Sequence, residues 1–150
     1  MSKTKGVAQP PKERLVIDSS VSIAWCFADE QDEYSQSVLD DLATKQDFAP
    51  YLWPLEVANT LLVGERRKRS SQANTVTWLG FLGSLPITVD EETRLHAFGN
   101  TMGLARDHNL SAYDAAYLEL AMRRGLPLAT LDDTLKAAAL AFGVPLYGIY

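Results

Sequence analysis

The sequence predicts an α/β fold built on a parallel sheet. Short segments rich in apolar and β-branched residues alternate with longer segments whose apolar residues recur at helical spacing. A dozen or more residues separate successive expected strands, as crossover connections in a parallel sheet require. The chain has 150 residues, of which 47% are hydrophobic, so it can bury one core without disulfides or metal staples. We therefore expect one compact domain.

Two strands and four helices are expected in the first half of the chain. Residues 15–18, LVID, form an apolar run that ends in an acid and leads into serines, which is typical of a buried strand entering a helix. Tyr34, Val38 and Leu42 lie four residues apart, as on one face of an amphipathic helix. Pro54 stands near the start of a helix with a basic end. The expected strands are 15–18 and 47–51, and the expected helices are 21–28, 32–45, 53–71 and 71–83.

The second half is expected to hold three more strands and three more helices. Residues 85–90, LPITVD, are partly β-branched and favour a strand. Ser111 is a good N-cap for the clearest helix in the chain, and Gly125 ends that helix after two arginines. The expected strands are 85–90, 127–131 and an edge strand at 144–150, and the expected helices are 91–109, 111–125 and 132–143.

Targeting and localisation signals are scarce. Residues 1–13 are polar and contain prolines, with no apolar segment of a signal peptide, so we expect a flexible tail before a domain at 14–150. No apolar run reaches the roughly 20 residues that span a bilayer. The single cysteine, Cys26, has no partner for a disulfide or a Cys-based zinc site. These features favour a cytoplasmic protein that does not contact a membrane.

The charge balance limits how the chain could bind nucleic acid. The net charge is -5 and the isoelectric point is about 5.0. Phosphate neutralisation needs Lys and Arg, so bulk positive charge is excluded as the basis of binding. Local basic patches or bound cations would have to serve instead. Acidic surfaces are compatible with a site for a hard divalent ion such as Mg²⁺, which prefers carboxylate oxygens.

Four acids occupy related positions in the expected fold. Asp18 and Asp132 lie between a strand and a helix, Asp114 lies in the first turn of a helix, and Glu56 lies near a helix start. In an open parallel sheet, strand-to-helix junctions gather at the carboxyl ends of the strands, where ligands bind. We therefore expect these four carboxylates to converge.

Each acid also has a local explanation. An aspartate at the junction positions of Asp18 and Asp132 is a favoured N-cap. Ser111 and Asp114 have the S-x-x-D spacing of a capping box, and Glu56 near a helix start suits the helix dipole. The hypothesis of a functional site therefore rests on the set of four and not on any one member.

Converging carboxylates have a chemical consequence. They repel one another unless protons or cations offset their charge. Mg²⁺ or Mn²⁺ bound among them could activate a water molecule and stabilise the oxygens of a phosphodiester under attack. The expected chemistry is therefore hydrolysis by a metal-dependent nuclease.

At these positions the sequence resembles the PIN-domain nucleases. The segments LVIDSSV, PLEVANTL, LSAYDAAYLELA and LATLDDTL are similar to the successive acidic motifs of that family and occur in the same order. The resemblance extends from about Leu15 to Tyr150. A free-standing domain of this size is most similar to a VapC-type toxin of a bacterial or archaeal toxin–antitoxin pair. The resemblance implies a short parallel sheet flanked by helices in three layers.

The resemblance also implies roles for individual residues. Asp18, Glu56 and Asp114 match three family acids, and Asp132 matches the fourth, more variable one, with Asp133 as an alternative. Small polar residues that support the acids in the family correspond to Ser20, Asn59 and Thr130. The family activity is cleavage of RNA that depends on Mg²⁺ or Mn²⁺ and is inhibited by a cognate antitoxin. A homodimer is also a family expectation.

Alternatives remain open at the sequence level. The basic run Arg66, Arg67, Lys68 and Arg69 could contact RNA, or could be only the solvated end of a helix. The chain could be a PIN-like module that binds RNA or protein without catalysis, or a PIN nuclease of RNA processing instead of a toxin. A phosphatase of the haloacid dehalogenase type is disfavoured, because it needs a second acid two residues after the first and Ser20 stands there.

Overall fold

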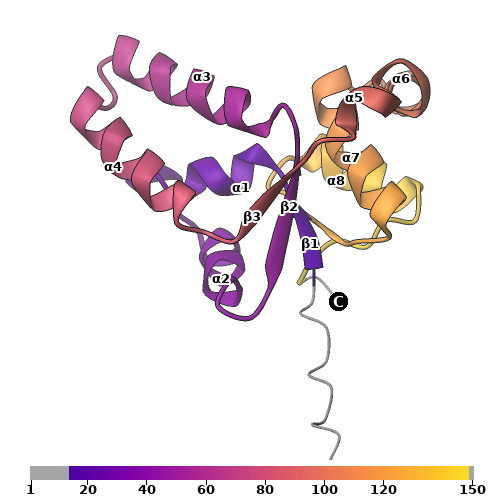
Figure 1. The fold of residues 1–150 in the computed structure, drawn as a ribbon, viewed down its shortest axis with the longest axis horizontal. Helices are drawn as coiled ribbons and strands as arrows, with labels where there is room; N and C mark the ends of the chain where they lie inside the picture. The colour runs from indigo at the N-terminus through magenta and orange to yellow at the C-terminus, as the bar shows by residue number, and fades with distance from the viewer. Residues whose placement is uncertain (1–13, 149–150) are drawn as a thin grey trace, which may run out of the picture.

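Four parallel strands form the centre of the molecule. The computed structural model describes residues 14–148, and its sheet has the strand order β3-β2-β1-β4 (Figure 1). All pairings between neighbouring strands are parallel, which confirms the predicted α/β class. The strands are β1 (Arg14–Ile17), β2 (Gln46–Pro50), β3 (Ile87–Asp90) and β4 (Leu128–Ala129).

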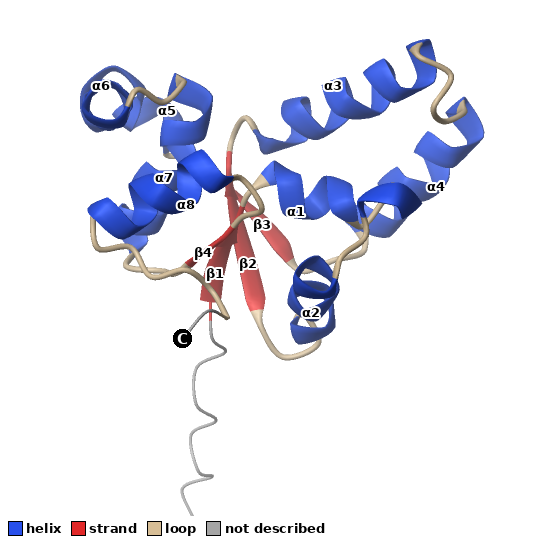
Figure 2. Ribbon diagram, turned by 180° about the vertical axis from the view of Figure 1, so that it is seen from behind, coloured by secondary structure: helices blue, strands red, loops and turns tan. Residues whose placement is uncertain are grey.

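Helices cover both sides of this sheet in a three-layer arrangement. Helices α1 to α4 lie on one side and α5 to α8 on the other, so the strands are enclosed between them (Figures 1 and 2). Within the described residues the helices are α1 (Ser19–Ala24), the 3-10 turn η1 (Ala28–Glu30), α2 (Glu33–Asp41), α3 (Trp53–Arg66), α4 (Gln72–Gly83), α5 (Thr93–His96), the π-helical segment η2 (Ala97–Thr101), α6 (Met102–His108), α7 (Ala112–Arg124) and α8 (Asp133–Ala141).

The core lies around β1 and α7. Leu15, Val16 and Ile17 are buried, as the near-continuous apolar sequence of an interior parallel strand predicts. Val16 pairs with Phe48 of β2 and with Leu128 of β4, so β1 is enclosed by strands on both edges. Helix α7 packs on β1 and β2 and buries its residues 115–121.

Several expected elements are shorter than predicted. The strand expected at 127–131 is reduced to β4, and the edge strand expected at 144–150 is a single bridge from Leu146 to Leu128. Helix α3 ends at Arg66, because the chain turns at Lys68, where φ is 58°. The helix expected at 91–109 is divided into α5, η2 and α6, and glycine and asparagine in η2 have low helix propensity.

The structure leaves both ends of the chain undescribed. The tail expected at 1–13 lies outside the described residues, as do the last two residues of the expected edge strand. Among residues 14–148 no helix has both the length and the apolar character to cross a bilayer. Because the strands are parallel, the carboxyl ends of β1, β2, β3 and β4 all lie at the same edge of the sheet, between α3 and α7 (Figure 1).

Candidate active site

Asp18 is the most deeply placed of the four predicted acids. It follows β1 directly and is 4% exposed. Its Oδ2 accepts hydrogen bonds of 2.7 Å from the hydroxyls of both Ser20 and Thr130. Although Asp18 occupies the N-cap position of α1, its side chain accepts no capping hydrogen bond. Helix capping therefore does not explain this aspartate, and the carboxylate is positioned instead by hydroxyl groups from two elements.

Ser20 and Thr130 connect the ends of the two adjacent strands. The Ser20 hydroxyl accepts the backbone N–H of Leu131 at 3.0 Å, and the Thr130 hydroxyl accepts the N–H of Asp132 at 3.0 Å. The Leu131–Ser20 bond and the Thr130–Asp18 bond link the β1–α1 turn to the β4–α8 turn, and the Asp132–Thr130 bond orders the second turn itself. The structure thus places both residues against Asp18, where the sequence analysis expected supporting side chains.

Glu56 approaches from the opposite side of the site. It lies in the first turn of α3, and its Oε1 accepts a 2.5 Å hydrogen bond from the hydroxyl of Tyr117 on α7. Tyr117 is fully buried. Tyr117 was not predicted from the sequence, although it lies three residues after Asp114 and so on the same face of the helix, a spacing that could have indicated it.

Asp114 and Asp132 complete the group from the first turns of their helices. Ser111 caps α7 by accepting the backbone N–H of Asp114 at 3.0 Å. Asp132 caps α8, because its Oδ1 accepts the N–H of Leu135 at 2.9 Å. Asp133 points elsewhere: its side chain is 99% exposed and lies 3.8 Å from Lys136. Of the two candidates for the fourth acid, the structure brings Asp132 to the group.

The electrostatics show that the four carboxylates act on one another. Burial raises the pKa of Asp18, and the charge of Asp132 adds to the effect although the hydroxyl donors oppose it. The pKa of Glu56 is raised by burial and by Asp18 and Asp114, while Tyr117 lowers it. The pKa of Asp114 is raised by burial and by the charges of Asp18 and Asp132. Asp18, Asp114 and Asp132 thus each make ionisation of a neighbouring carboxylate more costly.

The donor chemistry of this group fits a hard divalent cation, since all four side chains offer carboxylate oxygens. A cation would offset the charge repulsion that adds to burial in raising the three pKa values. In the described residues, however, no group of three or more His, Cys, Asp or Glu side chains is arranged as a complete metal site. The oxygens therefore need side-chain rotation or intervening water molecules to share one ion.

Other predicted site residues make no hydrogen bond to the acids. The side chain of Asn59, one turn after Glu56 on α3, is exposed and makes no hydrogen bond within the described residues, so its supporting role stays a prediction. Arg69 pairs with Asp29 at 2.7 Å and lies 4.0 Å from the centre of the Phe27 ring. It therefore has a local structural role. Arg66 lies ten residues beyond Glu56 on α3, which corresponds to about 15 Å along the helix.

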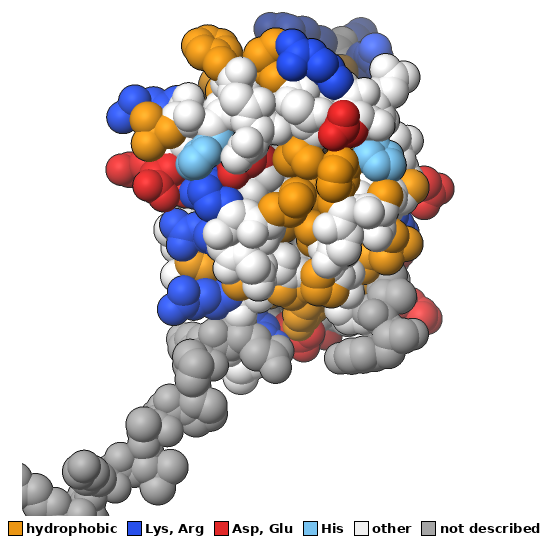
Figure 3. All heavy atoms as spheres, turned by 90° about the vertical axis from the view of Figure 1, so that its right-hand side faces the viewer, with side chains coloured by type: hydrophobic (Ala, Val, Ile, Leu, Met, Phe, Trp, Pro, Cys, Tyr) orange, Lys and Arg blue, Asp and Glu red, His pale blue; other side chains and the backbone are white. Residues whose placement is uncertain are grey.

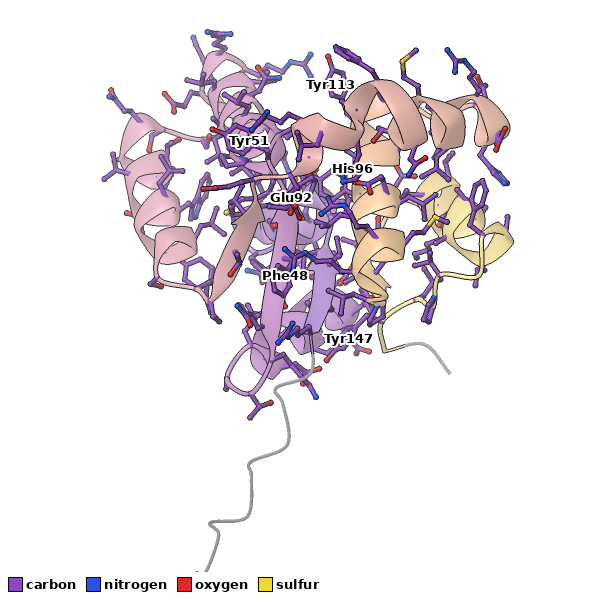
Figure 4. All side chains as sticks on the ribbon, turned by 45° about the vertical axis from the view of Figure 1, so that its right-hand side comes forward. Phe48, Tyr51, Glu92, His96, Tyr113 and Tyr147 are labelled. Carbon is purple, nitrogen blue, oxygen red and sulfur yellow. The ribbon has the colours of Figure 1, made fainter. Side chains whose placement is uncertain are left out.

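Two exposed tyrosines stand near the strand ends. Tyr51 precedes α3 and is 63% exposed, and Tyr113 precedes Asp114 and is 66% exposed. Both lie toward the end of the molecule where the strands finish, whereas Tyr147 lies near the opposite end of the sheet (Figure 4). Asp90, at the end of β3, is paired with Arg123 at 2.6 Å. Arg123 also contacts Glu119 and Glu92, so it is not free to bind a substrate phosphate.

A three-layer α/β domain with acids gathered at the carboxyl edge of a parallel sheet belongs to the class of α/β proteins whose ligand site lies at that edge. A comparison with protein families identifies which family of this class the chain belongs to. The family model described as PIN domain matches residues 15–140, and the chain belongs to the PIN domain family. PIN domains are generally nucleases.

Solved structures with similar folds agree with this assignment. PAE2754 from Pyrobaculum aerophilum is similar with a TM-score of 0.63 and 22% identity, covering 87% of this chain and 87% of that one. A toxin–antitoxin complex from Klebsiella pneumoniae contains a chain that is similar with a TM-score of 0.51 and 15% identity, covering 79% of this chain and 86% of that one. No curated protein matches the sequence. At these identities the structural likeness concerns the fold.

Proposed function

We propose that the chain is a metal-dependent endoribonuclease that hydrolyses RNA phosphodiester bonds. The observation that carries the proposal is the grouping of Asp18, Glu56, Asp114 and Asp132, which come from four different junctions. Burial, with charge repulsion within the group, raises the pKa of Asp18, Glu56 and Asp114. A fold does not need four repelling carboxylates at one edge, so their convergence favours a cation-dependent function.

Asp18, Glu56, Asp114 and Asp132 would hold Mg²⁺ or Mn²⁺. When bound, the ion supplies activation of water and stabilisation of negative charge at a phosphodiester. The chain's own residues orient the carboxylates for this task. Ser20 and Thr130 hold one oxygen of Asp18, which leaves the other carboxylate oxygen in weaker contact, 3.4 Å from the Ser19 hydroxyl. Tyr117 holds Glu56 in the same way from α7.

The RNA would be bound beside the acids and not by bulk charge. Tyr51 and Tyr113 offer exposed aromatic faces near the site, and stacking of a base on such a face contributes about 1–3 kcal/mol. Arg66, Arg67 and Lys68 are exposed at the far end of α3 and could reach a longer RNA only beyond the reacting bond.

We further propose that the chain is the toxin of a VapBC-type pair and that an antitoxin protein is its partner. Support comes from the motif resemblance to VapC-type toxins and from the family assignment. The Klebsiella pneumoniae structure with a similar fold is titled a toxin–antitoxin complex, which is consistent with this proposal. Self-association, also expected, has a candidate surface in the apolar side chains gathered over α5 to α8, including Leu95, Phe98 and Met122 (Figure 3).

The decisive test is cleavage of RNA by purified protein with Mg²⁺, with Mn²⁺ and with a chelator. Asp18→Asn and Asp114→Asn should each abolish cleavage, because each removes a carboxylate from the group. Asp133→Asn is the matched control, since its side chain is 99% exposed outside the group, and it should cleave as wild type does. Undiminished cleavage by the Asp18 and Asp114 variants would show that the active site lies elsewhere.

One observation favours a second candidate, a PIN-like module that binds RNA or protein without catalysis. The described side chains do not form a complete three-ligand metal group. This candidate predicts RNA binding without cleavage in any divalent ion. It also predicts that Mg²⁺ and Mn²⁺ leave the melting temperature unchanged. A PIN nuclease of RNA processing would instead cleave RNA but have no inhibitory protein partner.

A further inference from the structure

The side chain of Tyr51 stands open at the carboxyl edge of the sheet. Tyr51 follows β2 directly, lies two residues before the first residue of α3 and is 63% exposed. Within the described residues its ring makes no aromatic contact and its hydroxyl makes no hydrogen bond. Figure 4 shows the ring at the end of the molecule where the strands finish. The position of this ring is therefore set by its backbone and not by contacts of the side chain.

A hydroxyl group from another element holds that backbone. The Thr93 hydroxyl accepts the N–H of Tyr51 at 3.0 Å and donates to Oδ2 of Asp90 at 3.0 Å. Pro50 and Asp90 are the last residues of β2 and β3, and they are paired in register. Thr93 therefore continues the contact between the two strands beyond their last pair, at the point where Tyr51 leaves the sheet.

Asp90 is held as an anion by the helix that also carries Asp114. Its side chain is fully buried, and Arg123 of α7 lies 2.6 Å from its Oδ2. Although burial acts to raise the pKa of Asp90, the hydrogen bonds from Arg123 and Thr93 hold that pKa below its usual value. Arg123 is itself paired at 2.9 Å with Glu119, one turn earlier on α7. The buried network thus gives the Thr93 hydroxyl a charged acceptor in a fixed place.

Hydrogen bonds in such a chain strengthen one another. A hydroxyl that donates to a carboxylate makes a charge-assisted bond and becomes a better acceptor for the next donor. Arg123, Asp90, Thr93 and the N–H of Tyr51 form a chain of this kind, which runs from α7 across β3 to the turn that follows β2. Removal of the Thr93 hydroxyl breaks the chain beside Tyr51 and leaves the pair of Arg123 and Asp90 intact.

The same chain is not what holds Glu56. The start of α3 is fixed separately, since the Trp53 ring donates a 2.9 Å hydrogen bond to the buried Ser22 hydroxyl of α1. Glu56 itself is held from α7. Loss of the Thr93 hydroxyl should therefore free the Tyr51 turn and leave the carboxylate of Glu56 in place. The two effects can be separated by kinetics.

We propose that Thr93 is a positioning residue for the Tyr51 ring and that this ring is the stacking platform for one base of the RNA beside the acids. Stacking on an aromatic face tolerates every base, so it fixes where the RNA lies without selecting its sequence. Glu56 lies five residues after Tyr51, which is about 8 Å of helix rise, so the stacked base belongs to a nucleotide close to the reacting phosphodiester. This inference rests on the proposed function, because it assigns a contact to the RNA expected there.

RNA affinity without cleavage tests the ring. The probe is a short, fluorescently labelled, single-stranded oligoribonucleotide of mixed sequence. Its affinity is measured in a chelator, and with Mg²⁺ in the Asp114→Asn background, which should not cleave. Tyr51→Ala should weaken binding at least about fivefold, whereas Tyr51→Phe keeps the ring and should bind as the parent protein does. Unchanged affinity for Tyr51→Ala, or no RNA binding under either condition, would overturn the proposal.

Steady-state cleavage tests Thr93. Thr93→Val removes the hydroxyl at nearly constant size and should raise KM several-fold with kcat little changed, because it weakens RNA binding and not the chemical step. Thr93→Ser keeps a hydroxyl and should return KM close to the wild-type value. Thr88→Val is the matched control: Thr88 is exposed on β3, its hydroxyl accepts a hydrogen bond from Gln46, and its replacement should leave KM unchanged. Circular dichroism melting should first confirm that each variant folds.

A double variant tests whether Thr93 acts through Tyr51. Thr93→Val should add little to the loss of affinity in Tyr51→Ala, because the ring that it positions is then absent. Additive losses would mean that Thr93 acts on another contact. A lower kcat with unchanged KM for Thr93→Val would mean that it acts on α3 and Glu56. Either result would overturn the positioning role.

Two further results separate this inference from its alternatives. If Tyr51→Ala weakens binding of the polypeptide encoded by the neighbouring reading frame but not of RNA, the ring belongs to a protein contact and the proposal fails. Absence of cleavage by wild type in every divalent ion would reject the nuclease, while the RNA affinities in a chelator would still decide the role of Tyr51. Wild-type cleavage with unchanged KM in Tyr51→Ala and Thr93→Val would reject this inference alone.

Discussion

The hydroxyl of Tyr117 donates a 2.5 Å hydrogen bond to Oε1 of Glu56 and so connects the two helical layers at the end of the sheet. Tyr117 belongs to α7 and Glu56 to α3, which lie on opposite sides of the strands. The same face of α7 carries Asp114 one turn earlier. One buried tyrosine therefore fixes the spacing between an acid of one layer and the acids of the other.

Tyr117→Phe should move the acid limb of the pH–cleavage profile to higher pH. The tyrosine lowers the pKa of Glu56, which burial and the neighbouring acids raise. Without the donor that pKa rises further, so the carboxylate needs a higher pH to ionise. Cleavage rates across pH 5 to 9 measure the shift. Tyr113→Phe removes an exposed hydroxyl beside the site and should leave the acid limb of the profile where it is in wild type. Equal pH profiles for wild type and both variants would show that Tyr117 does not lower the pKa of Glu56.

Mg²⁺ or Mn²⁺ should raise the melting temperature, and a chelator should reverse the effect. An ion that binds the folded chain at 100 times its dissociation constant stabilises the fold by about 2.7 kcal/mol, or several degrees for a domain of this size. Asp18→Asn with Asp114→Asn should abolish most of the shift, whereas Asp133→Asn should retain it. An equal shift in all proteins would place the ion outside the four acids.

Asp47 should make the fold less stable as the pH rises. It is fully buried in β2, and neither carboxylate oxygen has a hydrogen-bond partner within the described residues. Burial, with the charge of Asp41, raises its pKa to about 8. The unfolded chain loses this proton near the ordinary value of about 4, while the folded chain keeps it to about pH 8. Stability is thus lost between these values as the pH increases.

Asp47→Asn should remove this part of the pH dependence. Between pH 5 and pH 8, the free energy of unfolding should fall by up to about 4 kcal/mol more in wild type than in the variant, because three pKa units correspond to about that energy. Urea unfolding at the two pH values measures the difference. Glu91→Gln changes an exposed carboxyl group and should follow the wild-type slope. A slope for Asp47→Asn that equals wild type would show that Asp47 ionises normally in the fold.

Arg123→Ala should destabilise the protein by about 3–5 kcal/mol, the range for removal of one partner from a buried ion pair. Arg123 lies 2.6 Å from Asp90 and 2.9 Å from Glu119, and the side chains of both acids are at most 4% exposed. The variant leaves Glu119 buried without a cation and leaves Asp90 with only the longer pair to Arg124, at 3.6 Å. Arg106→Ala, at an exposed arginine, should change the unfolding free energy by less than about 0.5 kcal/mol. Similar losses in the two variants would mean that the pairs to Asp90 and Glu119 contribute little.

The sequence was sufficient for the order of the elements and for the set of acids. Alternating strand and helix patterns predict a parallel sheet, and a parallel sheet brings strand-to-helix junctions to one edge. Asp18, Glu56 and Asp132 each follow a strand and could therefore be grouped without coordinates, whereas Asp114 follows a helix and was grouped with them by the motif resemblance. Asp132 and Asp133 could not be distinguished, because both are near the start of α8 and only the direction of the side chain separates them.

Other features depended on contacts between distant segments. The pairing of Tyr117 with Glu56 joins residues 61 positions apart. Asp47 looks in the sequence like a polar residue at the start of a short strand, and only the packing around β2 buries it. The uncharged and largely apolar composition of α4 is typical of a core helix, but α3 and α4 project from the sheet together and leave α4 largely exposed (Figure 1). The expected support from Asn59 has no counterpart among the hydrogen bonds of the described residues, and this role stays a prediction.

What the sequence determined by itself is the periodicity of the backbone elements and the identity of the carboxylates, because these depend on local spacing. The tertiary structure decided the environment of each side chain. Hydroxyl groups donate hydrogen bonds to Asp18 and Tyr117 donates one to Glu56, whereas Asp47 has no hydrogen-bond partner within the described residues and α4 is largely exposed. Burial and charge interaction depend on the distances between elements, and those distances are set only when the layers pack.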